Sequence, residues 1–290
     1  MRIFKFLLVI IGMAFLLSMT KDKPAYKIYN SKGKETSFQK MLEDAKKADV
    51  ILFGELHNNP IIHWLQLELS RDLYNELGNK LMLGAEMFES DNSLIINEYL
   101  AQNVNDRNFE AEARLWPNYK TDYKPLLEFA REMKLPFVAT NIPRRYAALV
   151  NRKGLQSLDS LSPEAKKLIA PLPIEFDGEL SGYKSMLEMM GGGGHGNDNL
   201  PKAQAIKDAT MAYFILKDFR KGENLFLHFH GTYHSDDYQG IMWYLLRSDP
   251  SLRIITIHSG EQESIEDLDE DRVGKADFII VTPESMTKTH

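Results

Sequence analysis

Short apolar runs alternate with segments of helical periodicity along most of the chain. After Pro60, apolar residues recur at helical spacing, and residues 124–133 and 202–219 are also predicted as helices. The runs predicted as buried strands are residues 50–53, 81–87, 136–140, 224–230, 254–257 and 278–281. Strands that alternate with helices predict an α/β fold with a mostly parallel sheet flanked by helices.

One stretch, residues 156–199, breaks this alternation. It is rich in proline and glycine and contains the glycine run 191–194, which is followed by His195. The run lacks the Lys-Ser/Thr pair of a phosphate-binding loop and does not follow a strand. We therefore predict a helical insertion subdomain over about 156–199 that ends in a flexible loop.

The first twenty residues form a separate segment. Arg2 and Lys5 precede an apolar run at residues 7–17, which is shorter than the roughly 20 residues of a comfortable membrane span. Residues 1–20 are therefore predicted to be a secretory signal peptide cleaved near Thr20, or else an uncleaved N-terminal anchor. Residues 21–40 are predicted as a linker and residues 41–290 as the folded domain. The protein is expected to be exported, either periplasmic or membrane-associated.

Composition excludes several kinds of chemistry. The chain of 290 residues is 43% hydrophobic, which is enough for a substantial core, and its formal net charge is 35 − 41 = −6. An acidic balance argues against nucleic acid as a partner. The absence of cysteine excludes disulfides, thiolate metal sites, a catalytic thiol and a lipid-modified cysteine. A bound metal would therefore need histidine, carboxylate or tyrosine ligands.

Ionisable side chains follow the predicted strands. In an open parallel sheet, ligands bind at the carboxyl ends of the strands, which lie along one edge. The side chains at or just after these ends are Glu55, His57, Glu86, Arg144, Arg145, His228, His230, His234 and His258. We expect them to converge on one rim, except that His228, the deeper of the His-x-His pair, is expected to be a core histidine hydrogen-bonded to the backbone.

Two interpretations of this rim remain open from the residues alone. Imidazole and carboxylate groups are common metal ligands, and strand periodicity places the two histidines of a His-x-His pair on one face. The candidate ligands are His57, His63, Glu86, His230 and His234. In the alternative, Glu55 caps a helix, Glu86 pairs with Arg144 or Arg145, and the rim is a buried polar network that fixes the fold.

Six motifs in order along the chain carry a family resemblance. They are residues 53–60 (FGELHNNP), 85–89 (AEMFE), 141–145 (NIPRR), 207–212 (KDATMA), 230–236 (HGTYHSD) and 275–283 (KADFIIVTP). Together they resemble the ChaN family of haem-binding uptake proteins, which is distantly similar to the Tiki/TraB and erythromycin-esterase group.

The resemblance implies an exported protein of haem or iron uptake with haem as its cofactor. In the haem-binding members, a tyrosine ligates the iron and haem is held between two subunits, which implies a haem-dependent homodimer and contact with outer-membrane uptake machinery. No motif identifies that tyrosine, so Tyr146 and Tyr183 are positional candidates, with Arg144 and Arg145 for the propionates. The chain departs from lipoprotein members because it has no cysteine for lipidation.

The wider group implies a second function, that of a metal-dependent hydrolase. Its catalytic residues would be Glu55, His57, Glu86 and His234, and a divalent metal ion would lower the pKa of a bound water molecule. This alternative gives the polar rim a role that a haem surface does not require. The sequence leaves both functions open.

Overall fold

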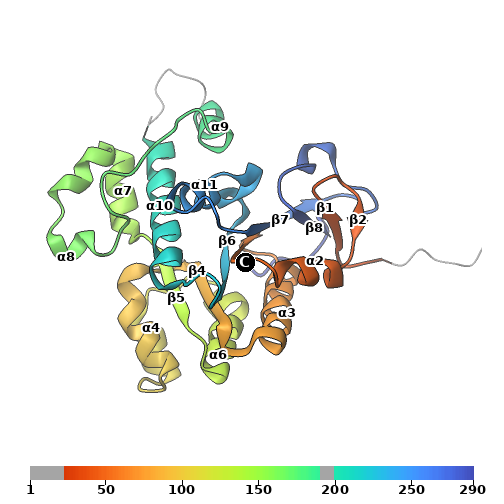
Figure 1. Ribbon diagram of the computed structural model, residues 1–290, viewed down its shortest axis with the longest axis horizontal. Helices are drawn as coiled ribbons and strands as arrows, with labels where there is room; N and C mark the ends of the chain where they lie inside the picture. Colours follow the sequence, from red (N-terminus) through yellow and green to blue (C-terminus); the bar gives the residue numbers. More distant parts are fainter. Residues whose placement is uncertain (1–22, 190–198) are drawn as a thin grey trace, which may run out of the picture.

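An eight-stranded sheet forms the centre of the computed structural model, which describes residues 23–189 and 199–290 (Figure 1). The strands are β1 (Lys27–Asn30), β2 (Glu35–Thr36), β3 (Val50–Glu55), β4 (Leu81–Glu89), β5 (Phe137–Asn141), β6 (Leu225–Gly231), β7 (Ile254–Gln262) and β8 (Phe278–Pro283). Their order is β2-β1-β8-β7-β3-β6-β4-β5, and β3 to β8 all pair in parallel. The predicted α/β class with a mostly parallel sheet is confirmed.

Helices cover both faces of this sheet. They are α2 (Phe38–Ala45), α3 (Pro60–Leu77), α4 (Ser93–Leu100), α5 (Asp106–Glu112), α6 (Lys124–Met133), α7 (Arg144–Lys153), α8 (Pro163–Lys166), α9 (Ser181–Met189), α10 (Leu200–Asp218) and α11 (Ile241–Ser248). The apolar sides of α3 and α6 form one core layer, and α10 and α11 form another on the opposite side of the strands (Figure 1).

The turn between β3 and α3 is set by local sequence. Asn59 caps α3, because its side-chain oxygen accepts hydrogen bonds from the backbone N–H groups of Ile61 and Ile62, and Pro60 occupies the first turn. The helix ends at Gly78, whose φ of 56° is a conformation that glycine adopts without steric cost. This short β3–α3 turn carries His57 directly after the end of a buried strand.

The structure corrects the prediction of a linker over residues 21–40. β1 and β2 form a hairpin within it, and β1 extends the sheet by pairing antiparallel with β8. Ile28 and Tyr29 are buried, and the Tyr29 hydroxyl donates a hydrogen bond to the carbonyl of Ile265 at 2.7 Å. Two adjacent apolar residues among charged neighbours gave too weak a periodic signal to indicate a strand.

Two of the sequence predictions lie outside the described residues. They are the signal peptide or anchor at residues 1–20 and the flexible loop with His195. No helix within residues 23–189 and 199–290 is long and apolar enough to cross a membrane. The described part of the insertion at 156–199 holds α8 and α9, and Leu158 and Ile169 pack it against α7 and α10.

Candidate functional site

A large cleft opens where the carboxyl ends of β3, β6 and β4 lie side by side. β6 sits between the other two strands, so Glu55, Gly231 and Glu86 are brought to one edge of the sheet. The cleft has a volume of about 1190 Å³. Its lining includes Glu55, His57, Glu86, Glu89, Arg114, Leu115, Trp116, Pro117, Asn141, Ile142, Arg144, Lys207, Gly231, Tyr233 and His234.

Glu55 is a buried carboxylate at the end of β3 that contacts three neighbouring side chains. Its Oε1 accepts a hydrogen bond from the Tyr123 hydroxyl at 2.9 Å and lies 2.9 Å from Nδ1 of His57, and its Oε2 accepts one from Gln66 at 2.7 Å. Burial acts to raise the pKa of Glu55, but the charge of His63 and the hydrogen bonds from His57 and Gln66 lower it below its usual value. Glu55 is therefore a buried carboxylate held in its ionised form.

His57 presents the reactive end of this pair to the cleft. Its side chain is 37% exposed and lies edge-on to the Trp116 ring, with 4.8 Å between ring centroids. A Cβ atom on Gly231 would lie 2.8 Å from Nε2 of His57, so the imidazole occupies space that only a glycine leaves open. Burial lowers the pKa of His57, but the hydrogen bond to Glu55 and the charge of Glu86 more than offset this and raise it.

His234 joins two other buried carboxylates of the site. Its Nε2 lies 3.1 Å from Oε1 of Glu86, and its Nδ1 is hydrogen-bonded to Oδ1 of Asp208. Burial acts against the charged form, but Glu86 and Asp208 together raise the pKa of His234 to about 9. Burial would raise the pKa of Glu86, yet the charge and hydrogen bond of His234 hold it well below its usual value. At neutral pH the centre of the site is therefore a carboxylate–imidazolium pair.

A second pair of histidines lies beneath this centre. His228 and His230 stack with their Nδ1 atoms 3.1 Å apart, and their other ring nitrogens contact the hydroxyls of Thr140 and Ser235. Burial, together with the positive charge of His234, lowers the pKa of His230 to about 3. Both rings are fully buried, and both pKa values lie below the usual range. They are neutral members of a hydrogen-bonded core.

The rim histidines and carboxylates do not form the predicted metal site. Among the described residues, no group of three or more metal-ligating side chains has the geometry to hold an ion. The physical reason is that the candidate ligands bond to other partners. His57 and His234 pair with carboxylates, His230 pairs with Ser235, and His63 contacts Gln66 and the backbone oxygen of His57 at 3.3 and 3.1 Å.

The other predicted site residues are dispersed. Arg144 lines the cleft, whereas Arg145 forms an ion pair with Asp91 and neither arginine pairs with Glu86. Tyr146 is half-buried on α7 beneath the Arg145 guanidinium, which lies 4.5 Å from its ring centroid. Tyr183 is only 3% exposed and donates a hydrogen bond to Asp208 at 2.7 Å.

Sequence reasoning missed three residues that hold the rim in place, namely Asp208, Gln66 and Tyr123. Asp208 lies in the helical segment 202–219 among alanine and isoleucine residues. A lone carboxylate on an apolar helix face is costly to bury, and this could have indicated that Asp208 pairs with a buried cation. A further carboxylate, Asp236, also orients a histidine of the predicted rim. Asp236 does so for His258, at 2.7 Å, rather than for His234.

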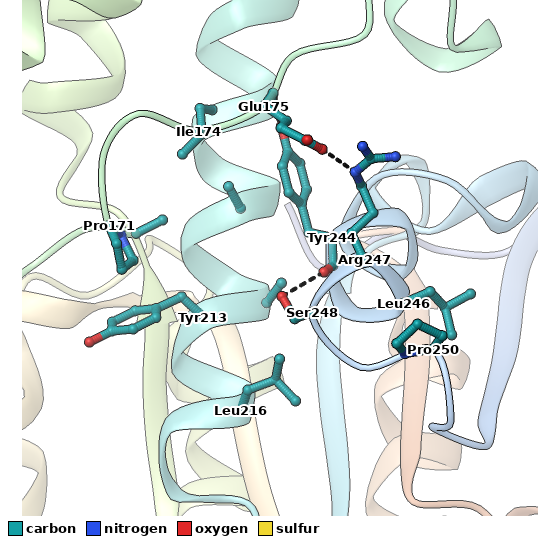
Figure 2. A pocket seen from close by; sticks show the side chains of 13 residues that line it. Pro171, Ile174, Glu175, Tyr213, Leu216, Tyr244, Leu246, Arg247, Ser248 and Pro250 are labelled. Carbon is teal, nitrogen blue, oxygen red and sulfur yellow. Dashed lines mark hydrogen bonds and ion pairs between the residues drawn. The ribbon is translucent and has the colours of Figure 1, made fainter.

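A smaller cavity of about 590 Å³ lies between α10 and α11, away from the predicted site residues. Figure 2 shows its wall of apolar side chains from α10, with an ion pair between Arg247 and Glu175 and the Tyr244 ring beside it. None of the predicted site residues lines this cavity.

The fold and site define an α/β protein with a cleft of paired histidines and carboxylates at the carboxyl ends of a parallel sheet. The model of the family "Haem-binding uptake, Tiki superfamily, ChaN" matches residues 41–245. The chain therefore belongs to this family, and the assignment from the sequence motifs is confirmed.

Among the similar solved structures, one shows the same fold. The ChaN structure from Campylobacter jejuni, which is described as binding haem cofacially, is 18% identical and has a TM-score of 0.62, with 90% of this chain and 98% of that chain covered. The type III effector HopBA1 is 13% identical over 84% of this chain and 90% of its own, with a TM-score of 0.47. A mutant of the erythromycin esterase EreC is 12% identical over 89% and 83%, also with a TM-score of 0.47. No curated protein matches the sequence.

Proposed function

We propose that this protein binds haem and serves in an exported pathway of haem or iron uptake. The observation that carries the proposal is the family match over residues 41–245. The cleft has the chemistry that haem requires, since an apolar wall can contact the porphyrin and cations can bind the propionates. The apolar wall comprises Leu115, Trp116, Pro117 and Ile142.

Tyr146 is the better of the two candidate iron ligands. Tyr183 is buried, and its hydroxyl is engaged by Asp208, so an external haem cannot reach it without opening of the protein. Tyr146 is half-buried on α7, two residues after the cleft-lining Arg144 and not itself part of the cleft lining, and Arg145 donates a hydrogen bond to its hydroxyl at 3.4 Å. When bound, haem would supply a ferric iron that phenolate oxygen ligates well.

A matched pair of tyrosine variants tests this assignment. Tyr146→Phe removes the proposed ligand, and Tyr183→Phe removes a hydroxyl of the same kind from the interior. We expect the high-spin spectrum of the hemin complex to be lost in Tyr146→Phe and retained in Tyr183→Phe. An unchanged spectrum in Tyr146→Phe would rule out Tyr146 as the iron ligand. If hemin binds neither the wild type nor the variants, the haem-binding function itself is ruled out.

A second candidate function, hydrolysis, is favoured by the Glu55–His57 pair. Glu55 binds Nδ1 of His57, and Nε2 has no hydrogen-bond partner among the described residues and lies at the edge of the cleft. A histidine oriented by a carboxylate can take a proton from water and return it to a leaving group. Because the predicted metal ligands are hydrogen-bonded to other groups of the protein, we propose this chemistry without a divalent metal.

Substitution of His57 separates the two candidate functions. His57→Gln should abolish any hydrolysis of a panel of carboxylic and phosphate esters, whereas hemin binding, which needs no proton transfer by His57, should persist. The matched control is His258→Gln, which changes a buried histidine that Asp236 orients outside this cleft. Absence of activity in the wild type across the panel, or equal activity in His57→Gln, would exclude the hydrolase.

A further inference from the structure

Three side chains that line the cleft have polar groups without hydrogen-bond partners. Arg144 is exposed at the start of α7, and Lys207 is half-buried on α10. Neither forms a hydrogen bond or an ion pair with another described residue. Asn141, the last residue of β5, is only 8% exposed, and its Oδ1 is buried with no partner.

These three side chains come from elements that pack against one another. Asn141 ends β5, and Arg144 begins α7 three residues later. Helix α10, which carries Lys207, packs against both β5 and α7. The arrangement therefore places a guanidinium, an ammonium and an amide on adjoining parts of the same wall.

The positive charge of this wall is not balanced by the acidic residues nearby. Among the carboxylates that line the cleft, Glu55 pairs with His57, Glu86 with His234, and Glu89 with Arg114 at 3.1 Å. Each of these acids already has a cation within ion-pair distance. The charge of Lys207 also acts on Glu86 through space, but neither Lys207 nor Arg144 forms an ion pair with a described residue, so both can bind a ligand anion.

The buried amide of Asn141 is a separate observation that points to a ligand. Most buried polar side-chain atoms in folded proteins have a hydrogen-bond partner, and an orphaned one calls for an explanation. Asn141 lines the cleft, and because no hydrogen bond to a described residue holds its amide, the group can rotate and donate from Nδ2 to a ligand atom. The acceptor oxygens of a ligand would pair with Nδ2 and with the two cations, whereas the buried Oδ1, itself an acceptor, would be matched only by a donor such as a ligand hydroxyl.

We propose that Asn141, Arg144 and Lys207 form a subsite for an anionic group, a carboxylate or phosphate, on the ligand of the cleft. If the ligand is haem, the group is a propionate, and this part of the inference rests on the proposed function. If it is the substrate of a hydrolase, the same three residues bind its carboxylate or phosphate beside His57. Arg144 provides a planar pair of donors and Lys207 a point charge.

The first arm of the test compares hemin with hemin dimethyl ester, in which both propionates are esterified. We expect Lys207→Met and Arg144→Met each to weaken hemin binding about tenfold, as loss of one charge-assisted hydrogen bond does. The ester should bind the wild type about as weakly as hemin binds the variants, and should be insensitive to the substitutions. Lys202→Met is the control, because Lys202 lies on the same helix and donates to Asn199 at 3.0 Å instead.

The second arm uses inorganic phosphate, measured by calorimetry at constant ionic strength. Binding to the wild type that is lost in Lys207→Met, but kept in Lys202→Met, would support the subsite even if hemin does not bind. In that case the subsite stands and the proposed haem function fails. Far-UV circular dichroism and melting temperature equal to the wild type show that each variant is folded.

One combination of results overturns the subsite. If hemin and its dimethyl ester bind equally, and neither hemin nor phosphate binding changes in Lys207→Met and Arg144→Met, the anion is not held here. Haem binding itself would survive that outcome, because hemin would still bind the wild type. The two claims therefore fail separately.

Discussion

At the residue scale, His234 decides the electrostatics of the molecule's centre. It is 4% exposed and contacts two carboxylates, Glu86 and Asp208, that are themselves buried. A buried carboxylate is costly unless a cation or hydrogen bonds compensate it. One protonated imidazole therefore offsets the burial of Glu86, whereas burial still raises the pKa of Asp208 despite the charge and hydrogen bond of His234.

Removal of the imidazole should destabilise the fold strongly. In His234→Gln, Glu86 and Asp208 lose their shared cation in a low-dielectric interior, and we expect the free energy of unfolding to fall by about 3–5 kcal/mol. Urea denaturation followed by circular dichroism measures this. The control is His57→Gln, because His57 is 37% exposed and solvent can replace its contacts. Equal stability of His234→Gln and wild type would contradict the account of the pair.

The same pair predicts a pH dependence of stability. Folding raises the pKa of His234 from 6.5 to about 9, so its contribution is complete below about pH 6.5 and is lost as the pH rises through 9. We expect the free energy of unfolding to drop by up to about 3 kcal/mol across this window. Urea midpoints at intervals from pH 6 to pH 10 check it. If the stability of the wild type depends on pH as little as that of His234→Gln, the raised pKa of His234 is contradicted.

The sequence predicted some of these residues and missed others for a physical reason. Glu55, Glu86 and His234 follow apolar runs directly, so the strand-end rule places them together without knowledge of strand order. Asp208 lies within a helix, and its pairing with His234 depends on where α10 crosses the sheet. The metal hypothesis failed to match the structure because the residue types cannot show whether an imidazole faces an open position or a carboxylate.

At the scale of elements, the position of β6 between β3 and β4 builds the cleft. The periodicity of the sequence predicted the parallel strands to within a few residues, and it predicted the helices α3, α6 and α10. It could not give the strand order, because the pairing of β6 with two strands distant in sequence depends on long-range packing. The β1–β2 hairpin was missed because it contains so few apolar residues.

Two glycines at the strand ends should respond differently to substitution. In Gly54→Ala the new Cβ would meet the backbone of Thr232 at 2.7 Å, so the strand ends must separate, and we expect a loss of about 1–3 kcal/mol in stability. In Gly231→Ala the new Cβ meets the tip of the His57 side chain at 2.8 Å, and this ring can rotate away.

Gly231→Ala should therefore keep most of its stability but shift the titration of His57. Rotation of the ring breaks its hydrogen bond to Glu55, so the pKa of His57 should move down toward the value of an ordinary histidine. Urea denaturation and NMR titration of the histidine ring protons measure the two effects. If Gly231→Ala loses as much stability as Gly54→Ala, the glycine supports the backbone rather than the His57 ring.

At the scale of the whole molecule, the proposed function predicts a change of assembly. Haem held between two subunits, as the family resemblance implies, requires a dimer that forms when hemin is added. Size-exclusion chromatography with light scattering on residues 21–290 should show the mass double with hemin and remain single without it. A monomeric hemin complex would contradict cofacial binding and leave haem binding at one subunit intact.

The central claim, that this member of the ChaN family binds haem, is tested most directly by a hemin titration of residues 21–290 followed by absorbance. The account predicts a Soret shift that saturates at one hemin per chain and is absent from a protein of similar size and charge. A shift that grows linearly without saturation, or one that the control protein reproduces, would contradict it.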